Sequence, residues 1–296
     1  MKFRFWGVRG SIPSPGPRTA RYGGNTTCIE VCTDDGTLII LDAGTGIFPL
    51  AQSLVARLPV QANIFITHSH WDHIHGLPFF TPLFNLGSRV RLHGAVDAAT
   101  EKGIEHVLGV QLQNSYFPVG ESQMQATIEY QTLNIGEPIE VGDALVGNVL
   151  MNHPATNLGY RITCNGKSLF FTGDHEPFYN LYPQDDPRHA PYNGHMEQRQ
   201  REIESAMRGV DALIVDCSYT RAEYPAKRGW GHGTLDSALE MAVRVGAGTL
   251  YITHHEPTRS DDDLEAVFAD LLARHQPMLP SVKVVLAYEG LEVTLA

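Results

Sequence analysis

The sequence lacks the features of a secreted disulfide-bonded protein or a membrane protein. Its four cysteines, Cys28, Cys32, Cys164 and Cys217, show no Cys-x-x-Cys spacing, so we expect free thiols instead of a disulfide framework or a thiolate metal site. No apolar run approaches the roughly 20 residues that span a bilayer. The segment Met1–Trp6 alternates like a strand and has no long apolar signal core. We therefore expect a cytoplasmic protein without a membrane partner.

Positive charge is also scarce. The chain has 22 Lys and Arg residues against 33 Asp and Glu residues, a formal net charge of −11 at pH 7. Extended nucleic acid is bound mainly by cationic side chains that displace counterions from phosphates, so such a partner is not expected. A local pocket for one small phosphate remains compatible with this balance. No Gly/Ser-rich, Pro-rich or charged linker interrupts residues 1–296, which predicts a single domain. The oligomeric state stays open, a homodimer included.

What the sequence does contain is a cluster of histidines directly after the apolar, β-branched run Asn63–Ile66, which is typical of a buried strand. Residues two apart in an extended chain point the same way, so His68 and His70 can reach one point. If a helix follows, Asp72 and His73 face a neighbouring point. Imidazole and carboxylate groups are ligands for zinc, iron or manganese. The alternative is a polar turn that happens to hold several histidines.

The run His68-Ser69-His70-Trp71-Asp72-His73 resembles the signature of the metallo-β-lactamase-fold hydrolases. Further matches extend from Asp42 to His254, so the resemblance covers most of the chain. It implies an α/β protein with an αββα four-layer sandwich and two divalent metal ions, zinc or else manganese or iron. The implied ligands are His68, His70 and His153 for one ion, Asp72, His73 and His254 for the other, and Asp174 shared between them.

Two of these matches lie at strand ends. Asp42 ends the apolar run Leu38–Leu41 and resembles the family's Asp-x-Gly motif, which implies that it orients a ligand imidazole. An Asp before the helix expected over residues 47–58 can equally be a helix cap. His153 follows an expected strand over residues 144–151. Its spacing to Leu-Gly-Tyr-Arg-Ile resembles the phosphodiesterase branch, which includes ribonuclease Z and the cyclic-phosphate phosphodiesterases.

The remaining implied ligands also follow apolar runs. Asp174 suits a bridging position because its two carboxylate oxygens can each bind one cation. His175 and Glu176 come next, but adjacent side chains point elsewhere, so we expect them to be loop residues. His254 matches the last ligand position of the family, and His255 should point away.

His232 is the residue that separates subfamilies. Its Gly-His-Gly-Thr segment resembles the Gly-His-Ser-Thr segment of ribonuclease Z and its phosphodiesterase relatives, with Gly233 in place of Ser. The resemblance implies contact with the scissile phosphate or the leaving oxygen. The alternative is a histidine packed in a Gly-rich turn. Asn25, in a Gly-rich turn, and Tyr219, on the loop before His232, are candidates for contacts with the substrate.

The regular structure is clear in some segments and obscure in others. Thr234 and Ser260 have the features of helix N-caps, each followed by an acidic residue and an apolar face. The charged segment His195–Arg208 is helical in pattern. Residues 177–194 hold several prolines and predict an irregular loop, and residues 111–135 show no clear period.

The function that fits these residues is hydrolysis of a small cyclic phosphate, such as a cyclic nucleotide, by a dinuclear metal site. Asp72 would accept or orient the proton of the attacking water, and His232 would contact a phosphate oxygen or protonate the leaving alkoxide. One alternative is a tRNA 3′-end endonuclease of the ribonuclease Z type. A second is a lactone, thioester or β-lactam hydrolase, and a third is a metal-bound sensor without turnover.

Overall fold

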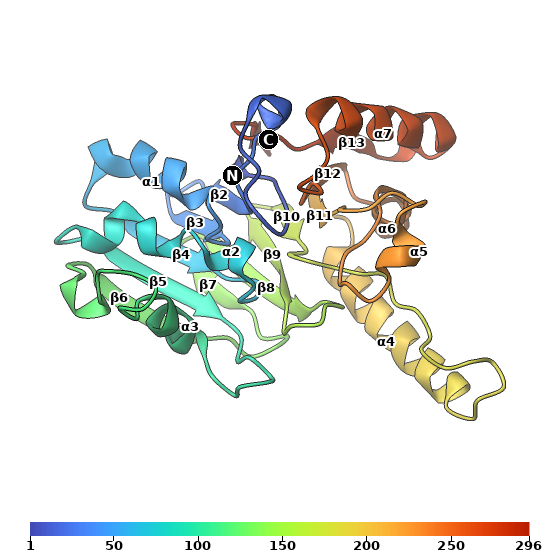
Figure 1. Cartoon of the computed structure of the whole chain (residues 1–296), viewed down its shortest axis with the longest axis horizontal. Helices are drawn as coiled ribbons and strands as arrows, with labels where there is room; N and C mark the ends of the chain where they lie inside the picture. The colour runs from blue at the N-terminus through green and yellow to red at the C-terminus, as the bar shows by residue number, and fades with distance from the viewer. Residues whose placement is uncertain (296) are drawn as a thin grey trace.

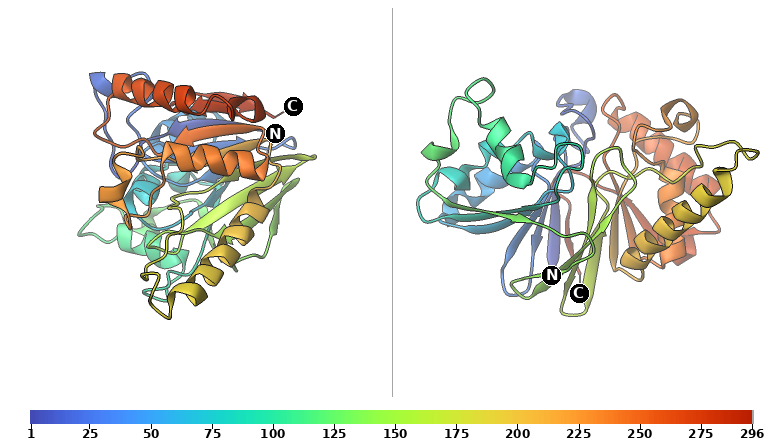
Figure 2. Two further views of the ribbon diagram at one scale, coloured as in Figure 1. Left: turned by 90° about the vertical axis from the view of Figure 1, so that its right-hand side faces the viewer. Right: turned by 90° about the horizontal axis from the view of Figure 1, so that it is seen from below.

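The computed structural model describes residues 1–295, apart from the side chains of residues 107 and 108. Two β-sheets pack face to face in this part of the chain, and helices cover the outer face of each (Figure 1, and Figure 2, right). The predicted αββα four-layer arrangement is therefore confirmed. Within the described residues, no helix is both long and apolar enough to cross a membrane.

The first sheet has the strand order β14-β1-β2-β3-β4-β5-β6. Strands β3 to β6 run parallel, whereas β14, β1 and β2 pair in antiparallel fashion with their neighbours. The strands are β1 Lys2–Gly7, β2 Cys28–Cys32, β3 Leu38–Leu41, β4 Gln61–Phe65, β5 Arg89–Gly94, β6 Thr127–Thr132 and β14 Glu292–Thr294.

The second sheet has the order β13-β12-β11-β10-β9-β8-β7, with β10 to β13 parallel. The strands are β7 Ile139–Val141, β8 Ala144–Leu150, β9 Leu158–Cys164, β10 Lys167–Phe171, β11 Ala212–Asp216, β12 Thr249–Thr253 and β13 Lys283–Leu286. The turn between β9 and β10 is Asn165-Gly166, and both residues have positive φ (50° and 76°), as a type I′ hairpin requires.

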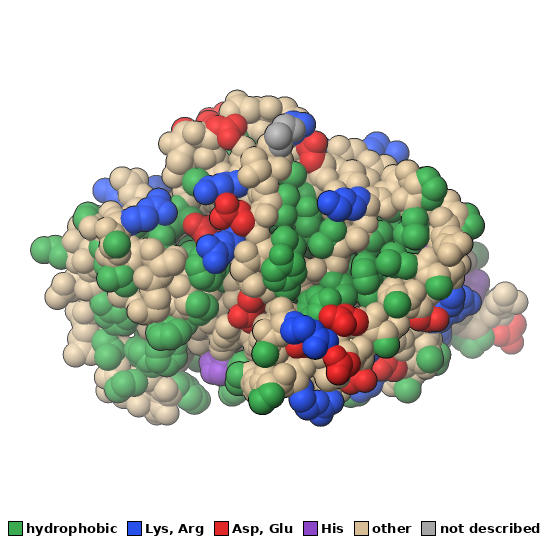
Figure 3. Space-filling view, turned by 90° about the horizontal axis from the view of Figure 1, so that it is seen from above, with side chains coloured by type: hydrophobic (Ala, Val, Ile, Leu, Met, Phe, Trp, Pro, Cys, Tyr) green, Lys and Arg blue, Asp and Glu red, His purple; other side chains and the backbone are tan. Residues whose placement is uncertain are grey.

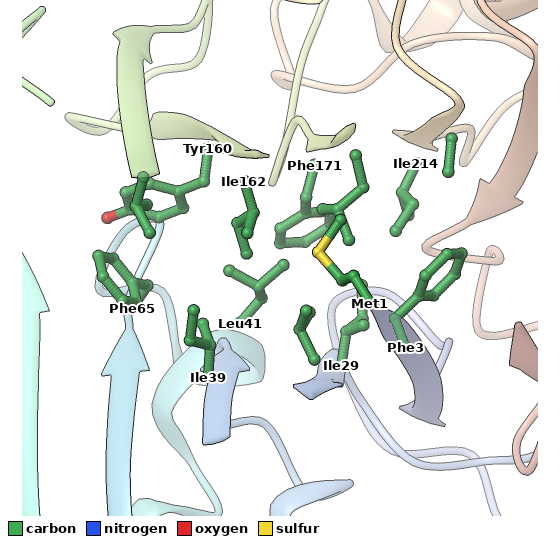
Figure 4. Close-up of a cluster of buried hydrophobic side chains, with 14 of the residues drawn as sticks. Met1, Phe3, Ile29, Ile39, Leu41, Phe65, Tyr160, Ile162, Phe171 and Ile214 are labelled. Atoms are coloured by element: carbon green, nitrogen blue, oxygen red, sulfur yellow. The ribbon is translucent and has the colours of Figure 1, made fainter. Parts of the chain in front are cut away.

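The core between the sheets is built from side chains that alternate along the strands. Figure 4 shows Phe3, Ile39 and Phe65 of the first sheet facing Ile162 and Phe171 of the second. Each of the five side chains is at most 1% exposed. The opposite faces of the strands form two further clusters beneath the outer helices, which is why the strands read as nearly continuous apolar runs.

The helices are α1 Ile47–Leu54, α2 Trp71–Ile74, α3 Ile104–Gln111, α4 His189–Met207, α5 Tyr224–Lys227, α6 Leu235–Val245 and α7 Asp261–Arg274. Helices α1 and α3 cover the first sheet, and α4, α6 and α7 cover the second. The side chains of Thr234 and Ser260 accept hydrogen bonds from the third residue of α6 and α7, so both predicted N-caps are confirmed.

Two segments differ from the prediction. Helix α4 begins at His189, inside the segment predicted to be an irregular loop, because Pro191 lies in the first turn, where its missing N–H has no helical partner to lose. Strand β6 lies within residues 111–135, for which no element was predicted. Its residues are partly exposed and do not alternate, so the sequence has no period-2 signal, and pairing with β5 determines the strand.

Candidate metal centre

The histidine-rich turn follows β4 at the carboxyl end of the first sheet. His70 is extended (φ −63°, ψ 150°), and the single-turn helix α2 starts at the next residue. The expected change from strand to helix is therefore present. His68 and His70 precede the helix, whereas Asp72 and His73 lie on it, so the two pairs are directed to neighbouring points.

The first group of potential ligands consists of His68, His70, His153 and Asp174, whose ligand atoms all lie within 4.8 Å of one another. Oδ2 of Asp174 is 3.5 Å from Nε2 of His68 and 3.8 Å from Nε2 of His153. Nδ1 of His70 is 3.1 Å from Nε2 of His153. Side chains from both sheets thus meet at one point.

The second group consists of Asp72, His73, Asp174 and His254, with ligand atoms within the same limit of 4.8 Å. Here the other oxygen of Asp174, Oδ1, is 3.2 Å from Nε2 of His73 and 3.2 Å from Nε2 of His254. Oδ2 of Asp72 is 3.1 Å from the same His254 nitrogen. Asp174 therefore directs one oxygen to each group, which is the geometry of a bridging carboxylate.

Several atoms at this centre are buried without a hydrogen bond. Nε2 of His68, Nε2 of His73 and Oδ1 of Asp174 have no partner among the described residues. Leaving buried polar atoms unpaired costs free energy unless another group satisfies them. Three such atoms converge in one place, and imidazole and carboxylate are ligands for divalent cations. The residues present therefore fit a divalent metal site.

The imidazoles are held by partners on their far side. Nδ1 of His73 donates to Oδ2 of Asp42 over 2.7 Å, and Oδ1 of Asp42 accepts the N–H of Thr67 over 2.7 Å. Nδ1 of His153 donates to the carbonyl of Gly231 over 2.9 Å. Such contacts fix the tautomer and leave the other ring nitrogen for a metal. Asp42 does not cap helix α1, whose N-cap is Gly46.

The carboxylates of the centre are held in the charged form. Burial would raise the pKa of Asp72, but His73 and the hydrogen bond from His254 outweigh it and bring this pKa below its ordinary value. The pKa of Asp174 is likewise well below its usual range, because His254, His73 and His232 overcome the effect of burial. Two buried anionic carboxylates surrounded by imidazoles favour the binding of cations.

His232 lies at the junction of the two groups. Its Nδ1 is 2.8 Å from Oδ2 of Asp216 and 3.8 Å from Oδ2 of Asp174. Its ring stacks on that of His254, with centroids 4.8 Å apart. Burial would lower the pKa of His232, but Asp216 and Asp174 outweigh it and raise the pKa to about 9. The imidazole therefore faces the centre and not the surrounding turn.

Residues 37–255 match the family described as the beta-lactamase superfamily domain. The chain belongs to the β-lactamase superfamily.

Several proteins are similar to this chain over most of its length. Ribonuclease Z of Thermoplasma acidophilum is 25% identical over 294 residues, with 88% of each chain covered. The structure of unliganded yeast PDE1 aligns with a TM-score of 0.67 at 15% identity, over 99% of both chains. A diphosphatase from the PhnP family aligns with a TM-score of 0.63 at 20% identity, over 100% of this chain and 98% of that one. The metallo-β-lactamase fold protein YhfI from Bacillus subtilis aligns with a TM-score of 0.65 at 17% identity, over 99% of this chain and 98% of that one, and this likeness shows the fold.

Asp216 is a residue of the site that was not predicted from the sequence. It ends β11 and is 1% exposed. Oδ1 of Asp216 accepts a hydrogen bond from Ser218 and lies 3.4 Å from Nδ1 of His254, while Oδ2 contacts His232. The signal was available, because Asp216, like Asp42, ends a buried strand, where a carboxylate must find donors.

Glu176 is more than the loop residue that was expected. It is 3% exposed, and its carboxylate accepts hydrogen bonds from the hydroxyl of Tyr224 (2.9 Å) and the N–H groups of Gly229 (2.8 Å) and Gly231 (2.9 Å). Gly231 has φ +90°, and a Cβ there would lie 2.4 Å from Nδ1 of His153. Glu176 therefore fixes the loop that supports His153 and leads to His232.

The other predicted residues are placed as follows. His255 points away from the centre and donates its Nε2 hydrogen to the carbonyl of Ala287 over 2.8 Å. Tyr219 lies beside His232, with ring centroids 5.9 Å apart. The amide of Asn25 donates to Glu289 over 3.0 Å, so this side chain supports its own loop.

Proposed function

We propose that this chain is a phosphodiesterase that uses two divalent metal ions and acts on a small cyclic phosphate or cyclic nucleotide. The proposed ligands are His68, His70 and His153 for one ion, Asp72, His73 and His254 for the other, and Asp174 for both. The observation that carries the proposal is His232, which Asp216 holds at the junction of the two groups of ligands. Hydrolysis of a lactam or lactone would not use this largely buried pair of Asp216 and His232.

The residues would divide the reaction between them. Divalent ions would supply Lewis acidity toward a phosphate oxygen and would lower the pKa of a water molecule. Asp72, whose Oδ2 accepts the N–H of Ser11 over 2.7 Å, would accept or orient a proton of the attacking water. His232 donates from Nδ1 to Asp216, which leaves Nε2 to bind a phosphate oxygen or protonate the departing alkoxide.

The nature of the ions follows only in part from the donors. Nitrogen and oxygen donors of this kind suit zinc, manganese and iron alike. We propose zinc first, with manganese or iron as the alternatives.

Because the ligands come from both sheets, we also propose that the chain works as one domain. We propose the cytoplasm as its compartment, with which its free thiols are compatible.

A second candidate is tRNA 3′-end processing, which the ribonuclease Z relatives favour. Two observations favour a small substrate instead. A tRNA endonuclease would need a basic, protruding arm to hold its substrate. The segment that projects furthest from the body, before and at the start of α4 (Figure 1), carries Asp185 and Asp186 beside Arg188, so it is not such an arm. On the face shown in Figure 3, Lys and Arg side chains are interspersed with Asp and Glu, and hydrophobic side chains lie between them.

The test combines metal analysis with a turnover screen. The screen compares bis-p-nitrophenyl phosphate, 2′,3′- and 3′,5′-cyclic nucleotides, precursor tRNA, a lactone and a β-lactam. We expect about two ions per chain and turnover of the small phosphodiesters. Turnover of the lactam or lactone alone would contradict the proposal, and cleavage restricted to precursor tRNA would select the second candidate.

A further inference from the structure

A cavity of about 200 Å³ lies beside the metal centre, and His153 lines both. Its walls include three aromatic side chains from the segment that follows Asp174, namely Phe178, Tyr179 and Tyr192. Because His153 belongs to the first group of ligands and also lines the cavity, one molecule can place a phosphate at the centre and a second part in the cavity.

Several polar atoms of the residues that line the cavity form no hydrogen bond within the described part of the chain. The hydroxyls of Tyr179 and Tyr192 and the side-chain oxygen of Asn152 make no hydrogen bond with the described residues. The amide nitrogen of Asn152, in contrast, is committed, because it donates to the carbonyl of Glu176 over 2.8 Å. Aromatic surface with a few converging polar atoms is typical of a site for a flat, polar ring.

Packing holds these walls in place. The guanidinium of Arg228 lies 5.2 Å from the ring centroid of Tyr179, and the rings of Tyr192 and Tyr182 meet edge to face at 5.3 Å. Glu176 also lines the cavity, and its three hydrogen bonds connect the cavity to the loop before His232. A preformed site loses less entropy when a ligand binds.

We infer that this cavity binds the nucleobase of a nucleoside phosphate whose phosphate lies at the metal centre. The inference rests on the proposed phosphodiesterase function and narrows its substrate class to nucleotides. The nucleobase would stack against Tyr179 or Tyr192, and its ring nitrogens and exocyclic groups would bond with the two hydroxyls and Asn152. Stacking on aromatic side chains does not depend strongly on which base is present.

Turnover with matched substrates tests the inference. One substrate is 2′,3′-cyclic AMP, and the other is the cyclic phosphate of 1-O-methylribose, which lacks only the base. We expect Tyr179→Leu and Tyr192→Leu each to lower kcat/KM for the nucleotide roughly 5- to 100-fold and to leave the base-free substrate within about twofold. Tyr288→Leu, at a partly exposed tyrosine (41%) outside the cavity, is the matched control. Equal losses on both substrates, or no loss on either, would overturn the inference.

Equilibrium binding separates this inference from the proposed function. AMP and ribose 5-phosphate are titrated into the metal-loaded protein by calorimetry. We expect AMP to bind at least tenfold more tightly, and Tyr179→Leu to remove most of that difference. If AMP is preferred but no phosphodiester is cleaved, the cavity assignment stands and the proposed function fails. If cyclic phosphates are cleaved but AMP and ribose 5-phosphate bind equally, the function stands and the cavity assignment fails.

Discussion

Nδ1 of His232 lies 2.8 Å from Oδ2 of Asp216, although the two residues are separated by the loop that carries α5. Asp216 ends a strand of the second sheet, and His232 precedes helix α6. This contact holds the His232 ring beside Asp174, and donation from Nδ1 to Asp216 leaves the second ring nitrogen, Nε2, for a substrate atom.

His232→Ala should keep the metal and lose turnover. We expect kcat on a small cyclic phosphate to fall about 10²–10⁴-fold, because a positioned acid contributes about that much. Metal content measured by mass spectrometry should stay at the wild-type value. His195→Ala, at an exposed histidine of α4, is the control. Unchanged turnover in the His232 variant would contradict its role.

Asp216→Asn should act through His232. The amide oxygen can still accept from Nδ1, but the charge that stabilises the imidazolium is lost, so we expect a smaller fall in kcat than in His232→Ala. In the double variant the two losses should not add, since both remove one function. Additive losses would show that Asp216 acts independently, for instance through His254. Metal content is measured in each variant.

Asp174→Ala should remove the group shared by both sets of ligands. We expect metal content to fall well below the wild-type value, whereas Asp72→Ala and His254→Ala, which alter one set, should lose less. Removing the metal with a chelator should also lower Tm, because ligand at 100 times its Kd stabilises a fold by about 2.7 kcal/mol. A Tm that chelation leaves unchanged would contradict a metal site built from these buried atoms.

Glu176→Ala should weaken both the loop and the centre. Tyr224, Gly229 and Gly231 lose their acceptor, and the N–H of Gly231, which is the buried one of the three, then costs about 1–3 kcal/mol if it stays unpaired. We expect a lower free energy of unfolding, measured in urea, together with lower kcat. Glu197→Ala, at a glutamate of α4 whose side chain is 70% exposed, should leave both within error. Equal stability of the two variants would contradict the role of Glu176 in fixing this loop.

His93 predicts a dependence of stability on pH. Burial lowers its pKa from 6.5 to about 3, and its ring stacks on Phe65 with centroids 4.1 Å apart. The folded pKa lies below the unfolded one, so the stabilisation is complete above pH 6.5 and is lost as pH falls toward 3. The free energy of unfolding should fall by about 1.4 kcal/mol per pH unit in that window from this group alone.

Urea unfolding of the metal-free protein at pH 7, 6 and 5 checks this. His93→Phe keeps the stacking on Phe65 but cannot bind a proton, so its stability should fall less steeply than that of the wild type. The difference between the two slopes isolates His93 from the other titrating groups. Parallel slopes would contradict the assignment.

Local sequence determined those features that depend on neighbours along the chain. His68 to His73 form their turn because a buried strand ends there and a helix starts, and both periods can be read from the residues. The N-caps Thr234 and Ser260 follow from side chains within three residues. Resemblance to the family supplied the partners that lie far apart, His153, Asp174 and His254, which local patterns alone leave as ordinary histidines and an ordinary carboxylate.

Only the tertiary structure decided which of these residues meet. Asp216 faces His232, and Glu176 binds Gly231, because the loop after β10 and the loop between β11 and α6 meet at one edge of the second sheet. Neither pairing has a spacing that a local pattern could reveal. The burial that makes Asp42 a partner of His73 also exists only in the folded chain. Hydrogen-bond partners of buried groups are set by packing between distant segments, whereas strand and helix signals arise within a few residues.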